Sequence, residues 1–326
     1  MMSNTHEPTT LRRIVVPLDG SELAEQALPY AQVLAERSGA EILLVRVVPA
    51  EWPGGPAEAR EHLLEVQEAR SYLGEIAGRI EARGVRALRS VPQGVPAARI
   101  AAEAQDADLI VMTTHGRSGV FRFLYGSVAE GVLARAKMPV MLVRAWIHNP
   151  DVDKLDQAPV LLVPLDGSAF AEAAIPFAAL LADTLGGEMV LVRAVYPPTL
   201  TLANEWMATS YLQEELEVRE EGARSYLEAV ARRWSGGGRR PRTYVGVGAP
   251  VEVIDDAARE VGAALVVMAT HGRGATTRLL LGSVAHSVLL RGTAPLVLIR
   301  PMGGAGEGAS TGSAAAVGEE GRHPKG

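Results

Sequence analysis

The chain has 326 residues, of which 48% are hydrophobic and 21% charged, and it includes 34 glycines. This composition excludes disorder throughout, and the length favours two domains because one core seldom serves a chain of this size. Lys and Arg number 32 against 38 Asp and Glu, giving a net charge of −6 without any basic run, so we expect no binding to nucleic acid or to an anionic membrane.

Cysteine is absent, which excludes disulfides and thiolate metal or catalytic sites. The first 13 residues lack the apolar region of a signal peptide. The longest apolar runs, such as Pro159 to Leu165, are far shorter than the roughly 20 residues needed to cross a bilayer. We therefore expect a cytoplasmic protein.

Apolar runs alternate with amphipathic segments along the first half of the chain. A helix is expected to begin near Ser21, and Pro29 falls inside it, as Pro176 does in the second half, so we expect a kink at each proline. The other expected helices cover 57–83, a segment starting at Pro96, and 127–135; the expected strands are 14–16, 42–48, 86–91, 109–112 and 140–144.

The second half of the chain repeats the first. The segment VPLDGS at 16–21 recurs at 163–168, ARSYL at 69–73 recurs at 223–227, and THGR at 114–117 recurs at 270–273. A repeat of this length is a whole domain, because the units of solenoid proteins are only about 20 to 50 residues long. We assign one domain to residues 10–145, a polar linker to 146–157, and the second domain to 158–301.

The last 25 residues, 302–326, include eight glycines and almost no large apolar side chain, which predicts a disordered tail. In each domain the strands are uninterrupted apolar runs separated by amphipathic helices, a pattern typical of a parallel sheet covered on both faces. The predicted fold class is thus α/β, with two tandem doubly wound parallel-sheet domains. Ligands of such folds lie beyond the carboxyl ends of the strands, where the strand order reverses.

One motif at that edge occurs twice. Thr114-His115-Gly116 is followed after nine residues by Gly126-Ser127 at the start of a helix, and the second copy has the same spacing from Gly272 to Gly282-Ser283. Glycines allow backbone N–H groups to approach a phosphate, and a helix N-terminus offers unpaired donors. Each serine could add a hydroxyl donor and cap its helix. A plain turn with a helix cap is the alternative reading.

These motifs, together with the VPLDGS segments and the final strands MPVMLVR and APLVLIR, resemble the universal stress protein family in a tandem form, with its adenine-nucleotide alpha hydrolase-like, or Rossmann-like, fold. The resemblance implies an ATP-binding stress-response or regulatory protein, with Mg²⁺ carried on the phosphates. It also implies an intramolecular pseudo-dimer through the last strands, and leaves open a homodimer and the identity of a protein partner.

The resemblance assigns roles to matching residues in each copy. Asp19 and Asp166 would position the adenine or ribose, although an Asx-type turn is an alternative for both. The backbones of Val47 and Ala194 would contact the base. The phosphates would be held by Gly116, Arg117, Gly126, Ser127 and Val128 in the first copy and by Gly272, Arg273, Gly282, Ser283 and Val284 in the second.

The signature of that family is Gly, two residues, Gly, nine residues, then Gly with Ser or Thr. This sequence departs from it at the first glycine, which is Thr113 in one copy and Ala269 in the other. A Cβ at that position is expected to narrow the approach of the backbone to a triphosphate. His115 and His271 could act as general bases, but neither has a partner at recognisable spacing, which favours ordinary loop histidines. We therefore expect a binding protein with at most weak ATPase activity; a slow ATP hydrolase or nucleotidyl-transferring enzyme, and a scaffold without nucleotide, remain alternatives.

Overall fold

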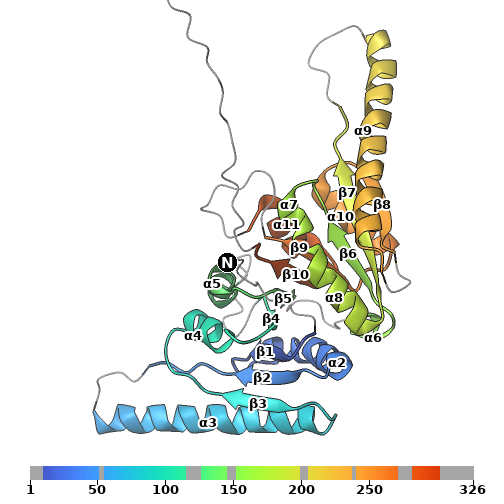
Figure 1. Cartoon of the computed structure of the whole chain (residues 1–326). Coiled ribbons are helices and arrows are strands. Elements are labelled where there is room, and N and C mark those ends of the chain that lie inside the picture. The colour runs from blue at the N-terminus through green and yellow to red at the C-terminus, as the bar shows by residue number, and fades with distance from the viewer. Residues whose placement is uncertain are drawn as a thin grey trace, which may run out of the picture.

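The computed structural model describes residues 10–50, 55–114, 126–144, 152–198, 205–236, 240–270 and 281–301. The halves of the chain fold alike (Figure 1), and we call them lobe 1, from β1 to β5, and lobe 2, from β6 to β10. The predicted tail, 302–326, lies outside the described residues. Within the described ranges, no helix has the length and apolar character that crossing a membrane would need.

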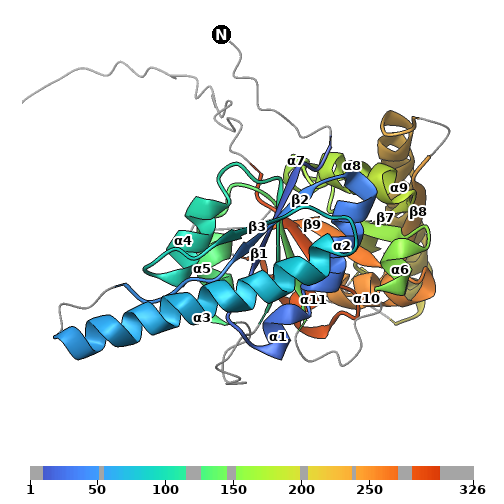
Figure 2. The same cartoon turned by 90° about the horizontal axis from the view of Figure 1, so that it is seen from below.

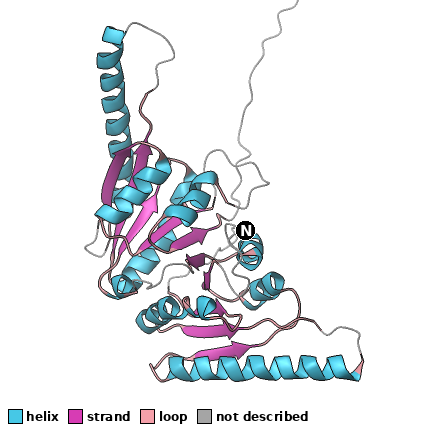
Figure 3. Cartoon of the chain, turned by 180° about the vertical axis from the view of Figure 1, so that it is seen from behind, coloured by secondary structure: helices cyan, strands magenta, loops and turns pink. Residues whose placement is uncertain are grey.

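Strands and helices alternate in both lobes (Figure 3). Lobe 1 consists of β1 (Arg13–Pro17), α1 (Glu22–Glu25), α2 (Leu28–Ser38), β2 (Glu41–Val45), α3 (Pro56–Glu81), β3 (Ala87–Ser90), α4 (Pro96–Glu103), β4 (Leu109–Thr113), α5 (Ser127–Arg135) and β5 (Val140–Val143). After α6 (Asp153–Asp156), lobe 2 consists of β6 (Val160–Pro164), α7 (Ala169–Glu172), α8 (Ile175–Leu185), β7 (Glu188–Val195), α9 (Glu205–Arg233), β8 (Arg242–Val247), α10 (Pro250–Glu260), β9 (Leu265–Ala269), α11 (Ser283–Arg291) and β10 (Leu296–Ile299).

The two half-sheets join into one ten-stranded sheet in the order β3-β2-β1-β4-β5-β10-β9-β6-β7-β8. Strands within each lobe are parallel, whereas β5 and β10 pair antiparallel, with Met141 opposite Val297. The predicted α/β class and the predicted pairing of the last strands are confirmed. The pairing leaves neither of these apolar strands as an open sheet edge.

Helices cover both faces of the sheet, as the uninterrupted apolar strands predict. In lobe 1, α2 and α3 pack on one face and α4 and α5 on the other, and α8, α9, α10 and α11 do the same in lobe 2. The long helix α3 packs beside β3 and β2, so it lies in front of the strands when lobe 1 is seen from below (Figure 2). The sheet is therefore buried between two helical layers.

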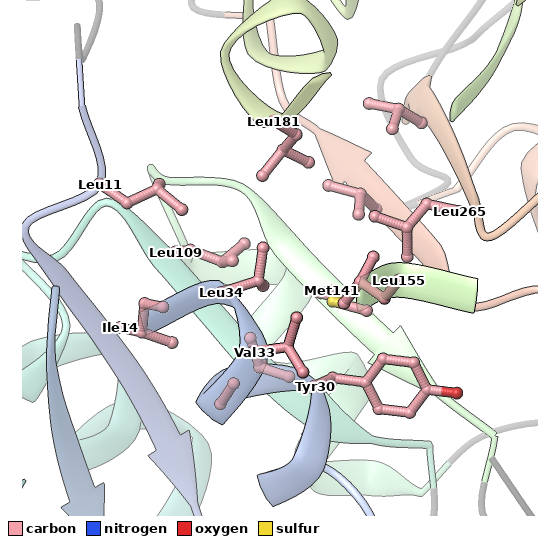
Figure 4. Close-up of a cluster of buried hydrophobic side chains, with 14 of the residues drawn as sticks. Leu11, Ile14, Tyr30, Val33, Leu34, Leu109, Met141, Leu155, Leu181 and Leu265 are labelled. Carbon is pink, nitrogen blue, oxygen red and sulfur yellow. The ribbon is translucent and has the colours of Figure 1, made fainter. Parts of the chain in front are cut away.

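Both hydrophobic clusters include residues of the two lobes, and the one on the α2 and α8 face also includes the segment between the lobes. Leu34 of α2, Leu155 of α6 and Leu181 of α8 are almost fully buried in it (Figure 4). Leu155 belongs to the segment predicted as a polar linker, which thus contains a turn of helix. An ion pair between Arg37 and Asp156, with Nη2 2.6 Å from Oδ1, also attaches this segment to α2.

The predicted kink at Pro29 is wrong, because the chain forms two helices there instead of one bent helix. α1 ends at Glu25, and Pro29 lies in the first turn of α2, where the N–H that proline lacks would have no intrahelical partner. Lobe 2 breaks in the same way between α7 and α8, with Pro176 in the first turn of α8. The predicted apolar face is nevertheless buried, as Ala31 and Leu34 show.

Candidate functional site

The strand order reverses between β1 and β4 in lobe 1 and between β6 and β9 in lobe 2. β1 and β4 are in register with Ile14 opposite Leu109, and the same register continued along the strands sets Asp19 level with Thr114. In lobe 2 the corresponding register sets Asp166 level with Thr270. The sequence motif and the aspartate therefore meet at the switch point in both lobes, where ligands of doubly wound sheets bind.

Asp19 forms the turn that leads from β1 into α1. Its Oδ1 accepts hydrogen bonds from the backbone N–H of Ser21 at 3.0 Å and from the hydroxyl of Ser21 at 2.6 Å. The Ser21 Oγ in turn accepts from the N–H of Ala24 at 3.2 Å and caps α1. Asp166 and Ser168 repeat this arrangement in lobe 2. The Asx-type turn is thus present, and one carboxylate oxygen of each aspartate is committed to it.

Gly126 and Gly282 begin the helices that follow the motif. The N–H of Gly126 donates to the carbonyl of Thr114 at 2.7 Å, and the N–H of Gly282 donates to the carbonyl of Thr270 at the same distance. Both glycines have ordinary extended φ angles, −64° and −61°, so the fold does not require glycine for its conformational freedom there. What glycine provides is a helix end without a side chain.

The first turn of each helix presents backbone donors toward this edge. In α5 the first intrahelical bond comes from the N–H of Glu130 to the carbonyl of Gly126 at 3.1 Å, so the N–H groups of Ser127 and Val128 have no partner within the helix. In α11 the N–H of His286 makes the equivalent bond to Gly282 at 2.9 Å. Two such helix ends, one per lobe, carry the positive end of a helix dipole.

Ser127 and Ser283 are not the caps that the sequence predicts. The capping position is taken by Gly126 and Gly282, and each serine is the first helical residue. The cap moves one residue back because the glycine adopts the extended conformation and its carbonyl accepts the first helical bond. Both serines are exposed, which leaves their hydroxyls at the surface of the helix end.

Val47 and Ala194 lie at the carboxyl ends of β2 and β7, next to the strands that carry the aspartates. The N–H of Leu18 donates to the carbonyl of Val45 at 2.8 Å, which ties the segment leading to Asp19 to the end of β2. Val47 and Ala194 are both half-buried against the cluster under α4, α5, α10 and α11. They therefore lie on the same side of the sheet as the two helix ends.

Thr113 and Ala269, which replace the first glycine of the family signature, are the last residues of β4 and β9 and are buried. Side chains alternate between the faces of a strand. Leu109 and Val111 belong to the cluster on the α2 and α3 face, so this alternation directs Thr113 to that face, opposite α5. We therefore expect the Cβ of Thr113 to obstruct little of the approach of a phosphate to the start of α5.

Six sequence-predicted residues lie outside the described residues and are not placed. They are the two loop histidines and their neighbours: His115, Gly116, Arg117, His271, Gly272 and Arg273.

A duplicated polar cluster beside each aspartate escaped the sequence analysis. In lobe 1 the guanidinium of Arg46 lies 5.2 Å from the ring centre of Tyr72, and the Tyr72 hydroxyl donates to Glu25 at 3.1 Å. Arg79 adds an ion pair to Glu25 at 2.7 Å. Burial, together with Glu25, raises the pKa of Tyr72 and keeps its hydroxyl protonated. The cluster fastens α3 to α1, directly after the turn formed by Asp19.

Lobe 2 repeats the cluster with Arg193, Tyr226, Glu172 and Arg233. The signal that could have found it is the ARSYL repeat, because its tyrosine is Tyr72 in one copy and Tyr226 in the other. A repeat alone cannot show that this tyrosine meets a glutamate of α1 or α7, since those residues are far apart in the chain.

The comparisons with known proteins agree on one family. Residues 10–144 and 159–300 each match the model of the universal stress protein family. A universal stress protein of Mycobacterium tuberculosis is 29% identical over 310 residues, which cover 90% of this chain and 99% of that protein. A universal stress protein of Methanocaldococcus jannaschii is 37% identical over 139 residues, or 41% of this chain and 82% of that protein.

Among solved structures, a universal stress protein from Archaeoglobus fulgidus superimposes with a TM-score of 0.65 at 25% identity, covering 88% of this chain and 98% of that one. The similarity thus spans both lobes together as well as each lobe. With two matches to the family model over most of its length, the chain belongs to the universal stress protein family.

Proposed function

We propose that each lobe binds an adenine nucleotide, ATP in the first place, at the carboxyl edge of its half-sheet. The observation that carries this proposal is the pairing, at both switch points, of a Gly-Ser helix end with an aspartate turn on the neighbouring strand. Membership of the universal stress protein family supports it. Nucleotide occupancy would then serve a regulatory role in the response to stress.

The helix ends suit an anionic group. The N–H groups of Ser127 and Val128, and of Ser283 and Val284, precede the first intrahelical bond of α5 and α11. Backbone donors and a helix dipole together favour phosphate. Neither capping glycine carries a Cβ that would stand between the helix end and a ligand. Gly116, Arg117, Gly272 and Arg273 are proposed to complete the two phosphate sites.

The base and ribose would lie nearer the aspartate of each lobe. In Asp19 and Asp166 one carboxylate oxygen accepts the hydrogen bonds of the turn, which fixes the orientation of the carboxylate. Val47 and Ala194 would offer backbone groups to the base. In the described part of the chain no group of three or more His, Asp and Glu side chains could hold a metal ion, so we propose that Mg²⁺ is carried by the phosphates.

We further propose that the protein binds ATP without turning it over rapidly. Fast phosphoryl transfer requires a group that orients the nucleophile near the γ-phosphate, together with cationic side chains. Asp19, which the sheet register sets level with Thr114, has one carboxylate oxygen committed to the Ser21 turn. A slow hydrolase or a nucleotidyl-transferring enzyme is the alternative, and a steady-state ATPase assay separates the two: turnover above about 1 s⁻¹ would favour the enzyme.

The binding experiment is a calorimetric titration of the full chain with ATP and Mg²⁺, for which we expect about two sites per chain. The chain with both Gly126→Asp and Gly282→Asp should lose both sites through charge repulsion. Aspartate is itself a favoured capping residue, so the substitution preserves the helix start.

The matched control carries Gly78→Asp and Gly222→Asp on α3 and α9. It adds the same two charges where a new Cβ meets nothing within 4 Å. We expect this control to bind as the natural chain does. Unchanged binding in the first double variant would refute the site, and no binding by the natural chain would refute the function.

A further inference from the structure

Arg144 of lobe 1 reaches into lobe 2 and holds the end of α11. It follows β5 directly, and its Nε donates to the carbonyl of Leu289 at 2.7 Å while Nη2 donates to the carbonyl of Val288 at 2.8 Å. Both carbonyls belong to the last turns of α11, where the helix dipole favours a cation. The side chain is only 2% exposed. A cation of one lobe is thus buried at the C-terminal end of the other lobe's candidate phosphate helix.

Lobe 2 is shaped to admit this guanidinium. Gly292 follows α11, and a Cβ built there would lie 2.8 Å from Nη2 of Arg144, 2.8 Å from the carbonyl oxygen of Val288 and 3.3 Å from Oδ1 of Asp255. Burial lowers the pKa of Arg144 to about 10, so it stays cationic near neutral pH, and Asp255 of α10 favours that charged form. Nη1 has no hydrogen-bond partner among the described residues.

Lobe 1 lacks these features at the matching positions. Ala136 follows α5 where Gly292 follows α11, and Ala101 of α4 matches Asp255 when the helices are aligned on Pro96 and Pro250.

The residue that matches Arg144 in lobe 2 is Arg300, directly after β10. Its Nη1 donates to the carbonyl of Ala134 in α5 at 2.8 Å, and the residue is exposed. Each lobe therefore contributes an arginine to the other across the interface, but Arg144 is buried beside Gly292 and Asp255, whereas Arg300 is exposed.

The position of Arg144 connects it to the candidate site through a single rigid element. α11 has nine residues and spans roughly 13 Å. Gly282 caps it, Ser283 and Val284 begin its first turn, and its last turns carry the two carbonyls that Arg144 binds. A shift of the bound end moves the donors at the free end, because the helix is hydrogen-bonded throughout.

We propose that Arg144 is a positioning residue, through which lobe 1 orients α11 and strengthens nucleotide binding in lobe 2. This inference rests on the proposed function. It makes the lobes unequal: lobe 2 depends on an arginine of lobe 1, whereas lobe 1 depends little on Arg300.

The test measures each lobe separately in the full chain. The Gly126→Asp chain reports ATP binding by lobe 2, and the Gly282→Asp chain reports binding by lobe 1. Arg144→Met keeps most of the side-chain volume and removes the charge and donors, and Arg300→Met is the matched control. We expect Arg144→Met to weaken lobe 2 about tenfold and to leave lobe 1 within about twofold. Arg300→Met should leave both lobes within about twofold.

A merely structural arginine would behave differently, because loosening the interface would weaken both lobes alike. Equal weakening of both lobes, or a lobe 2 affinity unchanged by Arg144→Met, would overturn the inference while the proposed function stands. If neither single-site chain binds ATP before Arg144 is changed, the proposed function and the inference both fail.

A second variant covers the case in which Arg144→Met does not fold. Gly292→Ala places in lobe 2 the residue that lobe 1 has at this position, and its Cβ would lie 2.8 Å both from Nη2 of Arg144 and from the Val288 carbonyl that accepts its hydrogen bond. We expect the same selective weakening of lobe 2, and Ala136→Gly in lobe 1 should have no effect on either lobe. An unchanged lobe 2 in the Gly292→Ala chain would overturn the inference.

Discussion

Lobe 1 and lobe 2 differ most around the two helices that begin at the candidate sites. In lobe 2, carbonyls in the last turns of α11 accept hydrogen bonds from the buried Arg144, and Gly292 leaves space for its side chain. In lobe 1, a carbonyl near the end of α5 accepts from the exposed Arg300, and Ala136 takes the place of Gly292. The fourth helical residue also differs, being Glu130 in α5 and His286 in α11. At this position lobe 1 therefore has a carboxylate near the helix end that we propose holds phosphate, and lobe 2 does not.

Other parts of the lobes are nearly identical. The turns formed by Asp19 and Asp166 make the same hydrogen bonds, and the clusters around Tyr72 and Tyr226 each consist of two arginines, a tyrosine and a glutamate. The residues that shape the sheet edge are therefore duplicated, whereas the charges at the two ends of α5 and α11 are not. Two sites of one architecture are therefore expected to differ in affinity.

The largest effect is expected from removing one site at a time. Gly126→Asp should weaken binding by lobe 1 at least about 100-fold, because a carboxylate at the helix end would face the phosphates of the ligand. Gly282→Asp should do the same in lobe 2. Calorimetry should find one remaining site in each variant, with lobe 2 the tighter of the two. Two sites in either chain would show that the substituted helix end does not hold the phosphates.

The next effect concerns stability at high pH. Burial raises the pKa of Tyr72 and Tyr226 above the usual value of 10.0, so the folded chain keeps protons that the unfolded chain loses. The contribution of the two tyrosines to the free energy of unfolding is therefore complete below about pH 10 and declines as the pH rises further. Changing both tyrosines to Phe should flatten this decline and cost about 1 kcal/mol per lost hydrogen bond at neutral pH.

Urea unfolding from about pH 7 to about pH 11 measures both quantities. Tyr211→Phe, at an exposed position of α9, is the control and should change neither. The two single variants, Tyr72→Phe and Tyr226→Phe, should behave alike, since the clusters are duplicated. A decline that persists unchanged in the double variant would contradict this account.

A smaller effect is expected from copying lobe 2 into lobe 1. Glu130→His removes a negative charge from the first turn of α5 and should strengthen ATP binding by lobe 1 roughly twofold to fivefold. The titration uses the Gly282→Asp chain, in which only lobe 1 binds. Glu81→His removes the same charge from the far end of α3 and should have no effect. Weaker binding in the Glu130→His chain would argue against phosphates at this helix end.

The smallest effect is expected from restoring the signature glycine. Thr113→Gly in lobe 1 and Ala269→Gly in lobe 2 should each change ATP affinity less than about twofold, because the strand directs these side chains to the face opposite the phosphate helix. Calorimetry on the two single-site chains checks this. A tenfold gain in either lobe would show that the Cβ does obstruct the ligand.

The sequence by itself determined the elements, the duplication and the placing of the motifs. The helix at 127–135 and the strands of the first half follow from periodicity, and the aspartate turns follow from the short-range chemistry of Asp19 and Ser21. All of these depend on residues close together in the chain. The sequence also predicted that the motif lies where the strand order reverses, because the ligands of doubly wound sheets bind there.

Only the tertiary structure decided the rest. The break before Pro29, the capping by Gly126 in place of Ser127, and the tyrosine clusters each depend on how an element meets its neighbours. Arg144 is the clearest case, because its partners lie about 145 residues away in the other lobe. In the sequence it is one more basic residue at the end of a strand. Its burial, and the difference between the lobes that follows, arise from the antiparallel pairing of β5 with β10, which brings that strand end beside α11.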